Sequence, residues 1–309
     1  MHRAIFFVIP LFVIAIPMGL YFTGWLDDPA IENRPIVFHF FDKGETPVPV
    51  TTPIVPGTGI GGPPPAPKPG ELVSAGGNVA VSSLVRDQVL PNPFVILGRA
   101  RAFEFVVEWR VKDETGTIVA KGSVSTDAVS VEEFGSFRVR SFYDRMPESA
   151  TGRVEVFTRS PSTGSEQELV TIPVRFPTET TVVKAYFPNQ EQDPNVERCE
   201  VTYPVTRRIP KTEEVMEAAM LELLKGPTAL EQRFGSRTAM VPGAGLRTVT
   251  REGDTMTVDF TRQFALGIAG SCMVGALRSQ VEETVKQFQG VRIVKILVEG
   301  ADAEQYLQP

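Results

Sequence analysis

Every second residue from Phe103 to Val111 is apolar, and the residues between them are charged except Val106, so one face of this segment is apolar and the other is mostly charged. A period of two predicts a half-buried β-strand. Trp109 lies on the apolar face, and we interpret it as a core residue of the strand rather than as a ligand-stacking aromatic. A turn at 113–116 and a second strand at 117–124 complete a predicted hairpin.

The surrounding segments repeat this pattern, and residues 72–176 contain no stretch with helical periodicity. Five more strands are predicted at 79–85, 94–99, 134–142, 153–159 and 168–176. Seven short strands with frequent turns are typical of an all-β, immunoglobulin-like sandwich, which we assign to residues 72–176.

Residues 180–309 change to an alternation of strands and helices. A strand at 182–187 precedes a helix that we expect to be capped by Thr212 and to end at Gly226-Pro227. A second helix, capped by Ser271, is expected over 272–288 because its apolar residues recur at spacings of three and four. The remaining expected strands are a hairpin at 246–251 and 255–260 and a closing strand at 291–298. This order predicts an α+β domain in which two helices pack on a mixed sheet.

The blocks at 90–100, 103–104, 113–116 and 170–176 resemble the immunoglobulin-like domain of bacterial spore-germination proteins, the Gmad type. Asn92-Pro93 stands where that family usually has Ser-Pro. The resemblance implies a structural or interaction module without a known active site.

Five blocks of the second half resemble the GerMN domain of sporulation and spore-germination proteins. They are Val183–Pro188, Leu221–Pro227, Val258–Phe260, Gly270–Cys272 and Thr284–Phe288. The resemblance implies an extracytoplasmic domain, and sporulation members of the family can assemble into rings between membranes. It therefore implies self-assembly or contact with other envelope proteins.

The first part of the chain predicts export. Residues 4–25 carry no charge over a length that can span a bilayer as a helix. His2 and Arg3 precede this span and Asp27 and Asp28 follow it, so we expect residues 1–27 to be a transmembrane signal anchor with a cytoplasmic N-terminus. A cleaved signal peptide is the alternative, and either would place the bulk of the chain outside the cytoplasmic membrane.

A proline-rich linker is expected over residues 28–71, which hold 11 of the 26 prolines. Proline is excluded from helix interiors and sheet ladders, so this stretch favours an extended spacer. The apolar island Ile36–Phe41 within it has no assigned role.

Charge and histidine content exclude several classes of function. The net charge is −6 without a block of Lys and Arg, which argues against a nucleic-acid partner. The two histidines, His2 and His39, precede both folded regions, so neither region can build a His-based catalytic or metal site. We therefore expect no cofactor and no metal.

The two cysteines, Cys199 and Cys272, both lie in the second half. Exported thiols tend to oxidise, so we expect them to form a disulfide; two buried thiols are the alternative. A metal site or a redox pair is disfavoured because no histidine is near and no Cys-x-x-Cys motif exists.

Two other features could carry chemistry. Asp259 is a polar position in an alternating strand, which favours a structural role over that of an acid or base. The turn at 267–272 could bind an anion through its amides, but it lacks the lysine of a phosphate loop, so we interpret it as a tight turn before a helix.

Three functions follow, in decreasing order of preference. The first is a membrane-anchored scaffold or assembly protein of the cell envelope, without enzymatic activity. The second is a module that binds cell-wall glycan or peptide. The third is a hydrolase that uses the carboxylates of Asp259 and Asp254.

Overall fold

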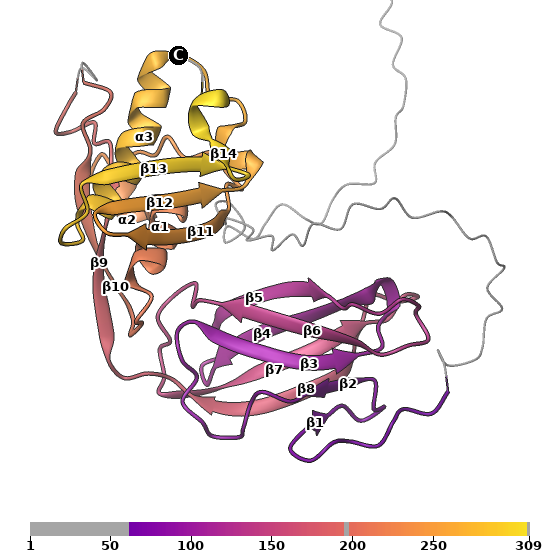
Figure 1. The fold of residues 1–309 in the computed structure, drawn as a ribbon. Helices are drawn as coiled ribbons and strands as arrows, with labels where there is room; N and C mark the ends of the chain where they lie inside the picture. The colour runs from indigo at the N-terminus through magenta and orange to yellow at the C-terminus, as the bar shows by residue number, and fades with distance from the viewer. Residues whose placement is uncertain (1–61, 195–197, 308–309) are drawn as a thin grey trace, which may run out of the picture. The chain divides into compact units, whose positions relative to one another are not determined.

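The computed structural model describes residues 62–194 and 198–307, which form two folded domains (Figure 1). The predicted membrane anchor and the apolar island Ile36–Phe41 lie outside the described residues. Within the described residues, every helix is too short or too polar to cross a bilayer.

The first domain is a sandwich of two antiparallel sheets. One sheet has the strand order β1-β2-β3-β6 and the other β5-β4-β7-β8. The strands are β1 Leu72–Val73, β2 Val79–Val81, β3 Phe94–Ala100, β4 Val106–Asp113, β5 Ile118–Ser125, β6 Gly135–Ser141, β7 Thr151–Arg159 and β8 Glu166–Arg175. The alternation read from the sequence therefore predicted the right architecture.

The core of this domain lies between the two sheets. Trp109 on β4 is 6% exposed and packs edge-on against Phe94 of β3, with ring centroids 5.6 Å apart. Its assignment to the core is correct. The strand predicted to start at Phe103 starts instead at Val106, because Glu104 and Phe105 have positive φ angles and form a 3-10 turn.

The second domain combines a β-hairpin, a four-stranded sheet and three α-helices. Its elements are β9 Thr180–Phe187, β10 Tyr203–Pro210, α1 Val215–Leu224, α2 Ala229–Arg233, β11 Leu246–Glu252, β12 Thr255–Phe260, α3 Ser271–Lys286, β13 Ile293–Val298 and β14 Ala301–Asp302. The sheet order is β11-β12-β13-β14, with β12 and β13 parallel and the outer pairs antiparallel. The mixed sheet with packed helices was predicted; β10, α2 and β14 were not.

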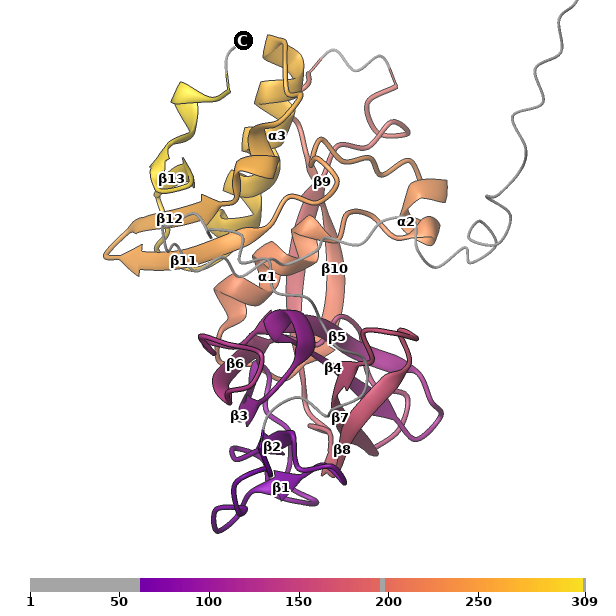
Figure 2. The same cartoon turned by 90° about the vertical axis from the view of Figure 1, so that its right-hand side faces the viewer.

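Helices α1 and α3 lie against each other and against β9, and both contribute to the core over the sheet (Figure 2). The apolar stripe of α3 is buried as its spacing predicts. Its members are Val274, Leu277, Val281 and Val285. They meet the inward residues of β12, namely Met256, Val258 and Phe260.

Both predicted helix caps are wrong by a small shift. The Thr212 hydroxyl accepts a hydrogen bond from the Glu214 N–H at 3.0 Å, but α1 starts after Glu214, so Thr212 stabilises the approach to the helix instead. Gly270, with φ at 88°, takes the cap position of α3, and Ser271 is its first helical residue. The positive φ suits glycine, which has no Cβ to oppose it.

Both edges of the β9–β10 hairpin are blocked. The Thr284 hydroxyl of α3 accepts a bond from the Tyr186 N–H at 3.1 Å, and the Gln287 side-chain amide bonds both the N–H and the C=O of Lys184. On the other edge, β10 contains Pro204 and Pro210, which lack an N–H for another strand. Strand β11, by contrast, ends its sheet and, among the described residues, pairs only with β12.

Candidate functional site

A hollow of about 410 Å³ opens in the second domain between the segment after β9, the start of β10, and α2. Its volume lies within the range of small-ligand pockets. Its lining combines carboxylate, amide and apolar side chains: Asn189, Glu191, Gln192, Tyr203, Pro204, Val205, Leu230, Glu231, Phe234 and Ser236. Sequence analysis predicted none of these residues as a site.

Asn189 organises one wall of the hollow. Its side-chain Nδ2 donates to the Phe234 carbonyl at 2.9 Å, and its Oδ1 accepts the N–H groups of Glu191 and Gln192 at 2.9 and 3.2 Å. These bonds turn the chain sharply after β9 and tie it to the end of α2. Both ends of the amide are used in these bonds, so Asn189 positions the wall of the hollow.

Arg207 of β10 holds the opposite side of the hollow together. Its guanidinium donates to the carbonyls of Glu222 and Gly226 at 2.6 and 2.7 Å, and to the Glu231 carboxylate at 2.7 Å. It also lies over the Phe187 ring, 5.4 Å from the centroid. The charge of Glu231 is therefore balanced inside the fold.

Glu231 has a second structural duty at the start of α2. Its carboxylate accepts the Thr228 N–H at 2.6 Å, while the Thr228 hydroxyl accepts the Glu231 N–H, which completes a capping box. This box fixes α2 so that Leu230 and Phe234, one turn apart, face outward. They are 62% and 63% exposed, so α2 and its C-cap residue place two large apolar side chains together at the surface.

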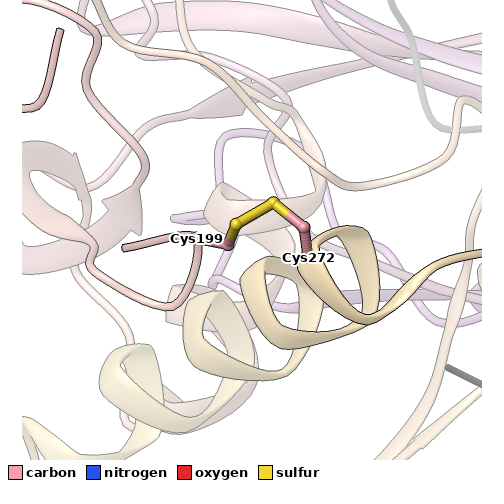
Figure 3. Close-up of a disulfide and its surroundings, with 2 residues drawn as sticks. All are labelled: Cys199 and Cys272. Atoms are coloured by element: carbon pink, nitrogen blue, oxygen red, sulfur yellow. A yellow bond between two sulfur atoms is a disulfide. The ribbon is translucent and has the colours of Figure 1, made fainter. Parts of the chain in front are cut away.

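The predicted disulfide is present between Cys199 and Cys272, 73 residues apart (Figure 3). It joins the segment before β10 to the first turn of α3. A hydrogen bond at 3.3 Å between the Thr202 and Ser279 hydroxyls lies close by. The segment that contributes Glu191 and Gln192 to the hollow is thus held at one end by Asn189 and at the other by the disulfide.

The two candidate carboxylates of a hydrolase are not brought together. Asp259 is 7% exposed, accepts the Gly300 N–H at 3.0 Å and pairs with Arg247 at 3.3 Å. Asp254 is exposed in the β11–β12 turn, at the other end of β12. They are five positions apart along the strand, which separates them by roughly 16 Å, too far for a shared proton or water.

The turn at 267–272 forms part of a longer connection than expected. A 3-10 helix, Arg262–Ala265, follows β12, and the turn leads from it into α3. Gly267 and Gly270 both have positive φ angles, which accounts for the glycines by backbone geometry.

A charged face on the first domain has the character of a structural network. Glu155 of β7 is 5% exposed and pairs with Arg110, with Arg153 at 2.6 Å and with Lys112 at 3.2 Å. Burial alone would raise its pKa, but the hydrogen bonds from Arg153, Arg110 and Lys112 outweigh it and lower the pKa from 4.5 to about 2. A carboxylate held charged in this way is a poor proton donor. Among the described residues, no group of three or more His, Cys, Asp or Glu side chains is placed to hold a metal ion.

The sequence carried one signal for the hollow. Thr228-x-x-Glu231 is a capping-box pattern, and the apolar residues at 230 and 234 would share one face of a helix that starts there. The other walls come from segments that precede these residues by 25 (Val205 to Leu230) to 45 positions (Asn189 to Phe234), so only the fold brings them together.

Both domains match known protein families. Residues 78–165 match the immunoglobulin-like domain of bacterial spore germination, and residues 184–304 match the family described as sporulation and spore germination. The order of the two domains is the one that the sequence blocks predicted. No curated protein matches the chain.

Three solved structures are similar to part of the chain, each over 40% of its length. The tandem GerMN domains of the sporulation protein GerM from Bacillus subtilis are 16% identical at a TM-score of 0.31. The first GerMN domain of the same protein is 15% identical over 86% of its own length at a TM-score of 0.29. A putative lipoprotein from Clostridium perfringens is 14% identical over 76% of its length at a TM-score of 0.26. The match spans about two fifths, 41%, of the tandem-domain structure.

Proposed function

We propose that this chain, which carries an immunoglobulin-like domain of bacterial spore germination followed by a sporulation and spore germination domain, is a membrane-anchored assembly protein of the cell envelope. Residues 1–27 would hold it in the cytoplasmic membrane, with the N-terminus inside. Residues 28–71 would space both domains from the membrane surface, and the domains would act by contact with their own copies or other envelope proteins.

The open edge of β11 is the observation that carries this proposal. Six of its seven residues are exposed or half-buried, and the strand contains no proline. An unpaired edge offers a row of backbone donors and acceptors to another strand. Within the second domain, the blocked edges of the β9–β10 hairpin direct such pairing to β11.

The disulfide supports the extracytoplasmic part of the proposal. Disulfides form and persist in oxidising compartments and are rare in the cytoplasm. Cys199–Cys272 closes a long loop in the second domain and therefore fits a protein that folds outside the cytoplasm.

A substitution at the β11 edge tests the assembly role. The full-length protein is expected to self-associate in sedimentation-velocity experiments, and Thr250→Lys should shift it toward monomer, because a lysine on an edge opposes strand addition. Thr257→Lys is the matched control, since Thr257 lies opposite Thr250 on the neighbouring strand, away from the edge. A wild-type protein that stays monomeric at all concentrations, or equal association of both variants, would contradict the proposal.

The hollow favours a second candidate, a module that binds a cell-wall glycan or peptide. It combines exposed apolar groups with carboxylate and amide groups, as a binding site for such a ligand requires. Co-sedimentation with purified peptidoglycan tests it: retention of wild type and loss on Phe234→Ser would favour this function over assembly.

A further inference from the structure

We infer that the hollow beside α2 receives a short segment of a partner protein, one that inserts an aliphatic or aromatic side chain next to a lysine or arginine. This inference deepens the binding role proposed for the second domain and names its ligand class. It rests on three observations: the apolar side chains in the lining, the ion pairing of its two carboxylates, and the missing backbone N–H at Pro204 in β10.

The apolar part of the lining selects an apolar side chain. Leu230 and Phe234 are each more than 60% exposed and are held outward by the capping box of α2. Val205 and Pro204 extend this surface across the hollow. The apolar lining combines the aliphatic side chains of Pro204, Val205 and Leu230 with the rings of Tyr203 and Phe234, a surface that can receive an inserted hydrophobic side chain.

The charged part of the lining selects a cation. None of the described residues that line the hollow is a lysine or arginine, whereas Glu191 and Glu231 both face it. Glu231 is neutralised by Arg207, but the Glu191 carboxylate forms no ion pair within the described part of the chain. A guanidinium or ammonium group of the ligand would form an ion pair with this carboxylate.

The backbone at the mouth of the hollow disfavours binding by strand addition. Pro204 lies in β10 at the mouth of the hollow and offers no N–H to a ligand strand. We therefore assign recognition to side chains, with one anchor in the hollow and one charge at Glu191. Such an arrangement concentrates affinity in a few residues, as at other protein interfaces.

A random 12-residue phage-displayed library, panned on the full-length protein, tests the inference. Enriched sequences are expected to combine a Leu, Ile, Met or Phe with a nearby Lys or Arg. A labelled synthetic peptide of the enriched sequence should bind about tenfold more weakly to Leu230→Ser and to Phe234→Ser, because each removes an anchor contact. Leu266→Ser is the matched control, since Leu266 is 48% exposed in the same domain but does not line the hollow.

The charge is tested separately. Glu191→Gln should weaken the peptide about threefold and reduce the salt dependence of binding, while Glu213→Gln, an exposed control, should change neither. Three results would each overturn the inference. The first is enrichment of acidic sequences, and the second is panning on wild type that enriches no sequence beyond those enriched on Phe234→Ser. The third is a wild-type protein that binds no peptide but is retained on peptidoglycan, with this retention lost in Phe234→Ser.

Failure here is distinguishable from failure of the assembly role. Phe234→Ser leaves the β11 edge intact, so its self-association in sedimentation velocity should equal that of wild type. If peptides fail to bind while association at β11 persists, only the ligand assignment falls.

Discussion

Replacing Arg207 should destabilise the second domain more than replacing any exposed cation on the same strand. Arg207→Ala removes a guanidinium that bonds two backbone carbonyls and two carboxylates and lies over Phe187. The carbonyl and carboxylate acceptors then lose the guanidinium as a donor, and Glu222 is only 8% exposed. A buried charge that loses its partner is costly because water cannot replace the lost bonds.

The size of the stability loss depends on the hydrogen-bond and ion-pair partners that Glu222 and Glu231 retain. Breaking a buried ion pair by removing one partner costs about 3–5 kcal/mol. Glu222 retains Lys225 at 2.5 Å, and Glu231 retains the Thr228 N–H, so the lower end applies. We expect the free energy of unfolding to fall by about 3 kcal/mol, which moves a urea midpoint by about 2 M.

Circular dichroism at 222 nm during urea unfolding is the assay. All α-helices of the described residues lie in the second domain, so this signal follows that domain, while the fluorescence of Trp109 follows the first. Arg207→Lys should fall between wild type and Arg207→Ala, since lysine keeps the charge but loses the planar fork.

Arg208→Ala is the control for this measurement. The Arg208 side chain is exposed and bonds only the Thr180 hydroxyl, at 3.2 Å, among the described residues. Its removal should change the unfolding free energy by less than about 0.5 kcal/mol. The reasoning about Arg207 is refuted if its alanine variant unfolds within that margin of the Arg208 variant.

Three further outcomes are expected. The Cys199→Ser/Cys272→Ser double variant should lose about 4 kcal/mol of unfolding free energy, from the 73-residue loop that it opens, and thiol titration of denatured wild type should find no free thiol. Glu155 has a folded pKa of about 2 against an ordinary 4.5, so the stability of about 3 kcal/mol that it contributes is complete above pH 4.5 and is lost as the pH falls toward 2. In Glu155→Gln, the unfolding free energy followed by Trp109 fluorescence should depend less on pH over that window. An unchanged pH dependence would contradict the assignment. Asp259→Asn should keep the hydrogen bond from the Gly300 N–H and lose only the ion pair with the half-exposed Arg247. Its unfolding free energy should stay within about 1 kcal/mol of wild type, with unchanged self-association. Loss of a measured activity would instead favour the hydrolase.

The sandwich could be predicted because its signal is local and regular. Along β4 each alternate residue from Val107 to Asp113 is buried, so the side-chain period of two directly mirrors the two faces of the sheet. The mixed sheet of the second domain was predictable for the same reason, since the stripe of α3 and the alternation of β12 are unbroken.

Strand β10 could not be predicted in this way. Its two prolines argue against a strand, and the inward position that usually carries an aliphatic residue carries Arg207. Its bonds to the ends of α1 and α2 make that position favourable, and those partners lie 15 to 24 residues away in sequence. Helix α2 is five residues long, too short for a periodic signal.

The hollow was missed because no single segment encodes it. Its walls meet only when Asn189 bonds the Phe234 carbonyl and Arg207 bonds Glu231, and both are long-range contacts. The disulfide needed no geometry to predict, since it followed from two cysteines and the expectation of export.

The pattern of protected strand edges limits the shapes that assemblies of the second domain can take. Both edges of the β9–β10 hairpin are blocked and β14 is only two residues long, so among the described strands of this domain β11 alone can add a full-length strand. Two copies that pair through this edge form a closed dimer related by a two-fold axis. Growth beyond a pair, into a circle or a fibre, therefore calls for a second and chemically different contact surface on each copy.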